Sequence, residues 1–539
     1  MVGATSSASV SALTAQLSAA GYDPILTPVT DSADSVQLTG AVMSPALVKP
    51  GSLFVAVTGA RAHGADFISE VIERGAAAVL TDPAGVAKVR EAVGYRIPVI
   101  QVDGVRHAAG PAAASIYGTT ATSDPALFGV TGTNGKTTTT YFLRSLLSTL
   151  LTPKGRKTGL IGTIEIAAGE ERIASDMTTP EAVSLHQLMH SFREKNVAAA
   201  AMEVSSHAIS YQRISGLYYD VAGFTNLTQD HLDLHGTMEK YFAAKAELFR
   251  RARTRTSVIT VDDAAGHQMA AEATGHVVTL ATTGQPTQAH WDVDDVQQEG
   301  LGSAFTLVNR HTHERIRTST ALPGGFNVSN AALAAVMVLE AASSTERTQD
   351  FTRADVVTAL ETAWPFHIQV PGRMQVIAES PAAIVDFAHN PDAMIRALEA
   401  VRRPTGRLIL VIGAAGERDA TKRPTMGGIA VRMADHVIIS DDDPHGEDPA
   451  EIRAGLLEGA RDAIATAELT TTLEEISPRR DAIRAAVAAA GPEDTILLAG
   501  RGHEDHQDMA GAKVSIDDRA ELAGALSDRG FQTLIGDQS

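Results

Sequence analysis

The sequence predicts an α/β protein of three domains, with a central parallel-sheet domain and a C-terminal Rossmann-like domain. Apolar segments of strand length alternate with helical stretches along most of the chain, as parallel βαβ units require. This pattern recurs in three blocks, and one strand leads into a glycine-rich turn. At 539 residues the chain has room for several independent cores. We expect domains at 1–123, 124–365 and 366–539.

Strand candidates define each block. In the first block they are Ser52–Val57 and Ala77–Leu80. In the second they are Ala126–Val130, Val197–Val204, Val221–Leu227 and Ser257–Val261, followed by a polar segment of β type at 282–320. In the third they are Ala383–Asp386, Leu408–Ile412, Val437–Ser440 and Thr495–Ala499, with helical patterns at Pro449–Ile464 and Arg479–Ala490. Polar residues follow these apolar runs, and ligands of open α/β sheets bind at the carboxyl ends of strands.

Composition excludes several classes of function. The net charge of −19 makes nucleic acid or an anionic membrane a poor partner. The absence of cysteine excludes disulfides, thiolate catalysis and cysteine-ligated zinc. The first basic residue is Lys49, and no apolar run approaches the ~20 residues of a membrane span. We expect a soluble, cytoplasmic protein without membrane insertion.

The glycine-rich turn is typical of polyphosphate binding. Residues 131–140 read Thr-Gly-Thr-Asn-Gly-Lys-Thr-Thr-Thr-Thr, between a buried strand and a helix. Backbone N–H groups freed by Gly132 and Gly135 can surround phosphate oxygens at the N-terminus of the helix. Lys136 would reach the terminal phosphates, and the Thr137 hydroxyl would ligate Mg²⁺. Val130 occupies the position of the first glycine in the strict P-loop spacing, yet we expect ATP or GTP binding.

Three more residues suggest a catalytic centre beside this loop. Glu203 lies at a predicted strand end, where a carboxylate facing a P-loop is a natural Mg²⁺ ligand. His231 follows the next strand, and Lys245 lies on the helical segment after it. Taken singly, His231 would be a surface or core residue and Lys245 a solvated helix charge. Their joint occurrence beside the loop favours a functional role.

The ordered motifs resemble those of the Mur ligases, the ATP-dependent amide-forming enzymes of peptidoglycan precursor synthesis. The resemblance covers nearly the whole chain and is strongest after residue 125. Within the family it is closest to the ligases that add the third amino acid, the tripeptide synthetases. The matching segments are Gly129–Thr138, Met202–His207, Asn226–His231, Ala244–Phe249, Gly325–Asn330, Pro371–Met374, Val385–His389, Gly413–Pro424, Asp442–Pro449 and Gly500–Glu504.

The resemblance implies a reaction through an acyl phosphate. The carboxylate of a UDP-N-acetylmuramoyl dipeptide attacks the γ-phosphate of ATP, and the amine of a diamino acid then displaces phosphate. Because two anions must meet, cations are needed between them, namely Lys136, Mg²⁺ on Thr137 and Glu203, and a second Mg²⁺. In the family that second ion is held by residues matching His231 and Lys245, the latter as N6-carboxylysine formed with CO₂. Burial can supply the neutral amine that this modification requires.

The resemblance also assigns ligand contacts, residue by residue. ATP contacts fall on Gly132, Thr133, Asn134, Gly135, Lys136, Thr137, Thr138, Asn327, Arg373, Asp386 and His389. Muramoyl-dipeptide contacts fall on Thr178, Thr179, Ser205 and Arg213. Contacts to the incoming amino acid fall on Arg418, Asp442, Asp443, Pro444, His445, Gly500 and Glu504. Since both later blocks contribute ATP contacts, the domains must close over the substrates and exclude water.

One motif bears on which amino acid is added. Relatives specific for meso-diaminopimelate carry Asp-Asn-Pro-Arg, whose arginine binds the distal carboxylate, whereas this chain has Asp442-Asp-Pro-His445. Imidazole does not reproduce the two-pronged guanidinium, and Asp443 adds negative charge suited to an ammonium group. We therefore expect L-lysine, with L-ornithine next because one methylene changes binding by only about 1–3 kcal/mol. The alternative is meso-diaminopimelate.

Other departures and alternatives remain. Ser44-Pro-Ala46 and His63-Gly-Ala65 replace first-domain runs that shape the uridine pocket in the family, so no uridine contacts are assigned. Arg501 and Phe387 replace the usual lysine and tyrosine. A folylpolyglutamate-synthase-like ligase is disfavoured by the separate first domain, and a non-catalytic nucleotide-binding relative by the complete set of catalytic residues. We expect a monomer.

Overall fold

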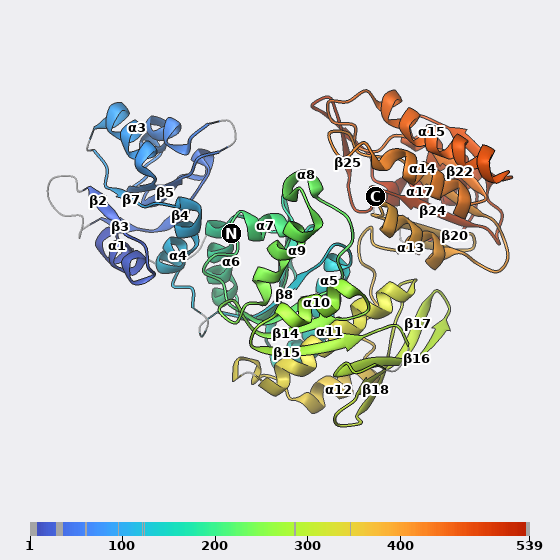
Figure 1. The fold of residues 1–539 in the computed structure, drawn as a ribbon, viewed down its shortest axis with the longest axis horizontal. Helices are drawn as coiled ribbons and strands as arrows, with labels where there is room; N and C mark the ends of the chain where they lie inside the picture. The colour runs from blue at the N-terminus through green and yellow to red at the C-terminus, as the bar shows by residue number, and fades with distance from the viewer. Residues whose placement is uncertain are drawn as a thin grey trace.

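The computed structural model describes residues 8–27, 36–59, 62–94, 96–120, 122, 124–284, 287–344 and 346–534 (Figure 1). Residue 123, at the first predicted boundary, lies outside this set. Three large sheets succeed one another along the chain, and the central and C-terminal ones are mainly parallel. The predicted α/β fold class is therefore confirmed.

The N-terminal sheet has the order β2-β7-β6-β5-β4 and is parallel except at β2. Its strands are β2 (Ile25–Thr27), β4 (Gly40–Val42), β5 (Ser52–Ala56), β6 (Ala78–Thr81) and β7 (Val99–Gln101). Two short strands, β1 (Ala8–Ser9) and β3 (Gln37–Leu38), form a separate pair. The helices are α1 (Val10–Ala19), α2 (Ile68–Glu73), α3 (Pro83–Val93) and α4 (Val105–Tyr117). Short 3-10 helices along the chain lie at Pro45–Leu47, Gly64–Phe67, Thr152–Lys154, Glu247–Phe249 and Glu346–Thr348.

The central sheet has eleven strands in the order β11-β10-β9-β12-β8-β13-β14-β15-β16-β17-β18. The parallel part comprises β9 (Lys157–Ile161), β12 (Val197–Glu203), β8 (Ala126–Thr131), β13 (Tyr219–Phe224), β14 (Thr254–Thr260), β15 (His276–Ala281) and β16 (Trp291–Glu299). Antiparallel strands extend both edges: β10 (Glu165–Ala168), β11 (Glu171–Ala174), β17 (Gly302–Asn309) and β18 (Arg315–Thr320). The polar segment 282–320 thus lengthens this sheet.

The helices of the central domain cover both faces of that sheet. They are α5 (Lys136–Leu151), α6 (Ala182–Glu194), α7 (Ser206–Ser210), α8 (Leu232–His235), α9 (Met238–Ala246), α10 (Ala264–Glu272), α11 (Gly325–Ser344) and α12 (Arg353–Thr362). Every residue of β8 and β12 is buried, as expected for parallel strands covered on both faces. The expectation that no apolar run approaches the length of a membrane span was wrong for one helix: among the described residues, α11 alone has that length and apolar composition, but 72% of its apolar window is buried inside the protein. It packs with α5 in the domain core, the usual place of such a helix in a globular protein.

The C-terminal sheet has the order β19-β20-β24-β21-β22-β23 and is parallel from β20 onward. Its strands are β19 (Gln375–Glu379), β20 (Ala382–Asp386), β24 (Thr495–Ala499), β21 (Leu408–Ile412), β22 (His436–Ile439) and β23 (Thr472–Glu475). The helices are α13 (Pro391–Val401), α14 (Lys422–Met433), α15 (Pro449–Ala467), α16 (Arg479–Ala489) and α17 (Asp518–Asp528). A hairpin, β25 (His506–Met509) and β26 (Ala512–Ser515), projects from this domain.

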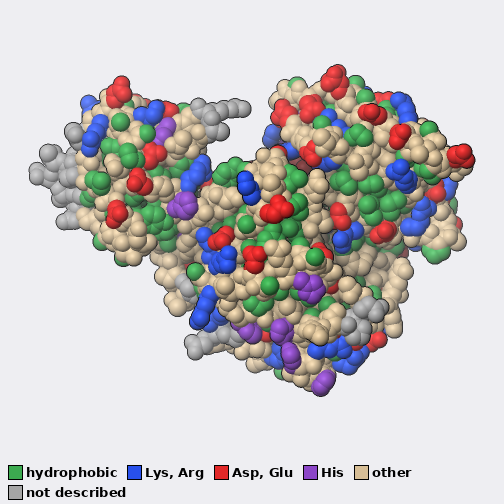
Figure 2. Space-filling view, in the orientation of Figure 1, with side chains coloured by type: hydrophobic (Ala, Val, Ile, Leu, Met, Phe, Trp, Pro, Cys, Tyr) green, Lys and Arg blue, Asp and Glu red, His purple; other side chains and the backbone are tan. Residues whose placement is uncertain are grey.

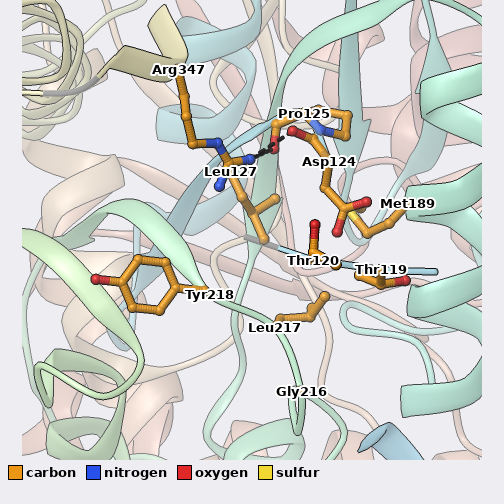
Figure 3. Close-up of a pocket in the computed structure, with 10 residues that line it drawn as sticks. All are labelled: Thr119, Thr120, Asp124, Pro125, Leu127, Met189, Gly216, Leu217, Tyr218 and Arg347. Atoms are coloured by element: carbon orange, nitrogen blue, oxygen red, sulfur yellow. Dashed lines mark hydrogen bonds between the residues drawn. The ribbon is translucent and has the colours of Figure 1, made fainter. Parts of the chain in front are cut away.

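Arg347 anchors the segment that leads into β8, the first strand of the central domain. Its guanidinium donates to the carbonyls of Asp124 and Pro125, at 2.7 and 2.6 Å (Figure 3). It also pairs with the buried Asp220 carboxylate at 3.3 Å. The cavity beside it holds only about 10 Å³, space for about one water molecule and not for a ligand. Arg347 therefore anchors the chain where it enters β8.

Candidate active site

A cavity of about 1590 Å³ lies between the central and C-terminal domains. The two domains face each other in Figure 1, and a wide notch separates the first domain from the third on the molecular surface (Figure 2). Most predicted site residues line the cavity: Thr133, Asn134, Gly135, Lys136, Thr137, Thr138, Thr178, Glu203, His231, Asn327, Arg373, Asp386, His389, Arg418, Asp442, Asp443, His445, Gly500 and Glu504. The predicted residues that are not among those lining the cavity are Gly132, Thr179, Ser205, Arg213, Lys245 and Pro444.

The P-loop between β8 and α5 is fixed by two glycines. Gly132 and Gly135 have φ values of +152° and +89°, which glycine adopts without strain. A Cβ on Gly132 would lie 1.8 Å from the Thr225 hydroxyl, and one on Gly135 would lie 2.4 Å from the Asn330 side chain. The loop therefore brings backbone N–H groups to the start of α5, where the helix dipole favours an anion.

Lys136 opens α5 and lies over the loop. Its ammonium donates to the carbonyls of Gly132 and Thr133 at 3.0 and 2.9 Å. Burial lowers the pKa of Lys136, and the nearby carboxylates of Glu203 and Asp230 act in the opposite direction. These contacts place the Lys136 side chain at the helix N-terminus, where the helix dipole favours an anion.

Glu203 ends β12 next to Thr137 and is only 1% exposed. Its Oε2 accepts from the hydroxyls of Thr137 and Thr163 at 2.9 and 3.0 Å, and its Oε1 accepts from the Thr163 backbone N–H at 2.8 Å. The carboxylate and the Thr137 hydroxyl thus converge at the P-loop, as a Mg²⁺ site there requires. Thr163, which sequence reasoning missed, orients Glu203 from a loop distant in sequence.

His231 and Lys245 meet around Tyr241. The His231 and Tyr241 ring centroids are 6.1 Å apart, and the Lys245 ammonium lies 4.5 Å from the Tyr241 ring centre. Lys245 is fully buried and donates to the Gly132 carbonyl at 2.9 Å. Burial first, and then the charge of Lys136, bring the pKa of Lys245 well below its usual value.

The metal-ligand set is incomplete from the protein alone. Among the described residues, no group of three or more His, Asp or Glu side chains could hold a metal ion. Burial lowers the pKa of His231, so its imidazole is neutral and able to ligate. The Glu203–Thr137 pair and, separately, His231 therefore fit Mg²⁺ only with further oxygens, which phosphate groups would supply.

Thr179, Ser205 and Arg213 form the support behind the carboxyl end of β12. The Thr179 hydroxyl donates to the Glu203 carbonyl at 2.8 Å and accepts from the Ser205 backbone N–H at 3.1 Å. Arg213 pairs with Glu181 at 2.9 Å and donates to the Thr179 carbonyl at 3.3 Å. Thr178 lines the cavity directly and lies 3.0 Å from the Thr163 hydroxyl.

The C-terminal domain contributes the opposite wall through β20 and the loop before β19. Asp386 accepts from the backbone N–H groups of Met374 and Ala388 at 2.7 and 2.9 Å, which fixes its orientation. Arg373 stacks over the Phe387 ring, its guanidinium 4.2 Å from the ring centre. Phe387, like the usual tyrosine, supplies the aromatic face. Burial lowers the pKa of His389 and raises the pKa of Asp386.

An acidic cluster closes the far end of the cavity. Burial, followed by the charge of Asp442, raises the pKa of Glu504 to about 7. The fully buried Arg501 lies behind both, with its Nη1 3.8 Å from Asp442 and 3.7 Å from Glu504. The exposed Arg418 lines the same region. Carboxylates thus accompany a cation, an arrangement suited to an amino acid with a second ammonium group.

The two walls already touch at the P-loop. The Asn134 side-chain amide donates to Asp392, at the start of α13, at 3.2 Å. Asn390 donates to the Asn134 side chain at 3.5 Å. Lys422 also lines the cavity; burial lowers its pKa, and the charge of Asp230 in the central domain acts in the opposite direction. Sequence reasoning missed these contacts, although Lys422 lies within a matching segment.

In the first domain, the unusual His63 has a structural role. Its Nδ1 accepts from the Ala65 backbone N–H at 2.9 Å, and its Nε2 lies 3.1 Å from Asp82. This His63–Asp82 pair joins the start of the Gly64–Phe67 turn to the N-terminus of α3.

Comparisons with known proteins agree with this geometry. Three family models match: "Mur ligase family, catalytic domain" at residues 36–117, "Mur ligase middle domain" at 130–339 and "Mur ligase, glutamate ligase domain" at 372–502. The match at 36–117 disfavours the folate-type alternative, which was expected to lack a first domain.

Full-length relatives give the same result. The chain is 43% identical over 91% of its length to the UDP-N-acetylmuramoyl-L-alanyl-D-glutamate–2,6-diaminopimelate ligase of Streptomyces coelicolor, covering 93% of that protein. It is 42% identical over 92% of its length to the UDP-N-acetylmuramyl-tripeptide synthetase of Leifsonia xyli, covering 93% of it. A solved diaminopimelate ligase structure aligns with a TM-score of 0.62 and 27% identity, covering 94% of this chain and 98% of that one. The chain therefore belongs to the Mur ligase family of ATP-dependent, amide-forming enzymes, and within it to the UDP-N-acetylmuramoyl-tripeptide synthetases.

Proposed function

We propose that the chain joins a diamino acid to UDP-N-acetylmuramoyl-L-alanyl-D-glutamate through an acyl phosphate made from ATP. One observation carries the proposal: a single cavity collects the P-loop, Glu203 and the acidic cluster around Glu504. Nucleotide chemistry and amine recognition therefore share one space. ATP and Mg²⁺ use follow from membership of the family.

The proposed chemistry assigns each wall a task. Lys136 and the α5 N-terminus hold the phosphates and offset their charge as the substrate carboxylate approaches. Thr137 and Glu203 would hold one Mg²⁺, and His231 with a modified Lys245 would hold a second; these ions would neutralise charge developing on the transferred phosphoryl group. Arg373, Asp386 and the P-loop bind the nucleotide from opposite sides, so closure of the domains excludes water from a hydrolysable acyl phosphate.

The proposal includes a carbamate on Lys245. Its burial supports this, because desolvation leaves the neutral amine that reacts with CO₂. The product is an anion 4.5 Å or so from the Tyr241 ring centre and close to His231, where a second cation could bind. The fully buried ammonium, bonded only to the Gly132 carbonyl among described residues, has no carboxylate partner of its own.

The identity of the diamino acid has two candidates. Relatives at 37–43% identity are named 2,6-diaminopimelate ligases, and these names support meso-diaminopimelate better than the lysine expected from sequence. A second candidate, L-lysine or L-ornithine, is favoured by the Asp443 and Asp508 carboxylates 3.9 and 3.5 Å from the His445 ring. A nucleotide-linked soluble substrate also supports the expected cytoplasmic location.

One assay tests the proposal. ADP release and the muramoyl product are measured with the UDP-linked dipeptide, ATP and each diamino acid in turn. Amino-acid-dependent formation of a tripeptide product is the expected result. ADP release that none of the amino acids stimulates would contradict the proposed function. A higher kcat/KM for lysine or ornithine than for meso-diaminopimelate would favour the second candidate.

A further inference from the structure

The β25–β26 hairpin contacts the loop that carries Asp443 and His445. Parallel bridging joins His445 to Met509: the His445 backbone N–H donates to the Asp508 carbonyl at 2.9 Å, and the Ala510 N–H donates to the His445 carbonyl at 2.7 Å. The Asp508 backbone N–H donates to the Asp443 carboxylate at 2.6 Å. The hairpin thus holds the loop that carries His445 against the cavity.

This contact brings a second carboxylate to His445. Asp508 Oδ2 lies 3.5 Å from His445 Nδ1, and Asp443 Oδ2 lies 3.9 Å from Nε2. The other Asp508 oxygen accepts from the Gly511 backbone N–H at 2.7 Å, which fixes the carboxylate in the turn. Lys513, opposite Asp508 in the hairpin, makes no ion pair with it in the described part of the chain.

In either charge state, His445 offers little net attraction to the carboxylate of a ligand. A neutral imidazole offers no positive charge to an approaching carboxylate. A protonated imidazole already has a carboxylate near each ring nitrogen, so its charge is offset before any ligand arrives. Of the nearby cations, Arg423 is paired with Glu447 at 2.9 Å and Arg501 lies behind Asp442 and Glu504, whereas Arg418 and Lys422 line the same cavity.

We propose that Asp508 acts through His445 as a positioning residue that selects against a carboxylate at the distal end of the incoming amino acid. The inference rests on the proposed function, which places the diamino acid in this cavity. An ammonium at the distal carbon faces Asp442, Asp443 and Glu504 and is accepted. A carboxylate on the same carbon meets His445, which already has the Asp443 and Asp508 carboxylates beside its two ring nitrogens.

The test compares kcat/KM for meso-diaminopimelate and for L-lysine in wild type and Asp508→Asn. Asparagine keeps the oxygen that accepts from Gly511, so the turn is retained while the charge is lost. We expect the diaminopimelate-to-lysine ratio to rise about tenfold, with the KM for ATP unchanged. The control is Asp505→Asn, which removes an exposed carboxylate of the same segment and should leave the ratio unchanged.

A double variant tests whether Asp508 acts through residue 445. In His445→Arg alone, Asp508 would pair with the new guanidinium, so the ratio should rise less than in His445→Arg combined with Asp508→Asn. An unchanged ratio in Asp508→Asn, together with equal ratios in these two arginine variants, would overturn the role of Asp508. Wild-type enzyme that forms product with none of meso-diaminopimelate, L-lysine and L-ornithine would instead contradict the proposed function, and this inference with it.

Discussion

Replacing Glu203 by glutamine separates the metal function of this residue from its structural function. The Glu203 side chain is 1% exposed, and its Oε1 accepts from the Thr163 N–H while its Oε2 accepts from two threonine hydroxyls. A glutamine can keep its oxygen toward the Thr163 N–H and turn its amide toward Thr137 and Thr163. Both hydroxyls can reverse and accept, since a hydroxyl is donor and acceptor.

The fold should therefore survive the change while catalysis does not. Because every hydrogen bond has a replacement, we expect the free energy of unfolding to fall by about 1 kcal/mol or less. The lost negative charge has no replacement at the metal. Removing one preorganised electrostatic group from an active site costs about 3 kcal/mol of transition-state stabilisation, or about 10² in kcat. The Mg²⁺ concentration for half-maximal activity should also rise at least about tenfold.

The assay is product formation titrated with Mg²⁺ at saturating ATP, together with thermal unfolding of each variant. Glu361→Gln, on the exposed face of α12, serves as the matched control and should behave as wild type in both measurements. An unchanged Mg²⁺ titration in Glu203→Gln would refute the metal role and leave Glu203 a purely structural residue. A large loss of stability would show that the threonine hydroxyls do not reverse.

Three further predictions concern other parts of the cavity. Lys245→Ala should abolish ligation but leave ATP binding, measured by calorimetry, intact. Added acetate should partly restore turnover of the variant, whereas bicarbonate should stimulate only the wild type. Near-normal turnover of the variant in CO₂-free buffer would rule out the carbamate. Gly132→Ala should abolish nucleotide binding, because its Cβ would lie 1.8 Å from the Thr225 hydroxyl, whereas Gly524→Ala, with open space around its Cβ, should bind normally. Glu504 has a pKa raised from 4.5 to about 7, so ionisation and ammonium binding should increase kcat/KM for the amino acid as pH rises through about 7. The same raised pKa means that the folded state holds the proton more tightly, so the stability of the free enzyme should decline from pH 4.5 to about 7. Glu504→Gln should remove both pH dependences, and a kcat/KM profile that stays the same in this variant would assign the titration to another group.

The local sequence was sufficient to predict the positions of site residues that lie at the end of a single strand or helix. The P-loop glycines, Lys136 and Thr137 lie within one strand–turn–helix unit, and Glu203 lies at a strand end, so periodicity and spacing predicted their positions. The apolar runs that formed β8, β12 and β21 were likewise recognisable because parallel strands are buried on both faces.

The contacts between residues from distant segments could not be predicted from local sequence patterns. Lys245 reads as an ordinary helix charge, and only packing of α9 beneath the P-loop buries it completely. Thr163 reaches Glu203 across 40 positions, and Asp508 reaches His445 from another segment of the C-terminal domain. The sequence therefore indicated that His445 lacks the guanidinium of diaminopimelate-specific relatives, but it gave no sign of the second carboxylate beside it.

The hydrogen bond between Asn134 and Asp392 affects how the central and C-terminal domains can move relative to each other. The P-loop and the C-terminal domain are joined through the Asn134 side chain, whose partner lies 258 positions away in the sequence. Movement of the third domain away from the second must therefore either break this hydrogen bond or carry the Asn134 side chain with it.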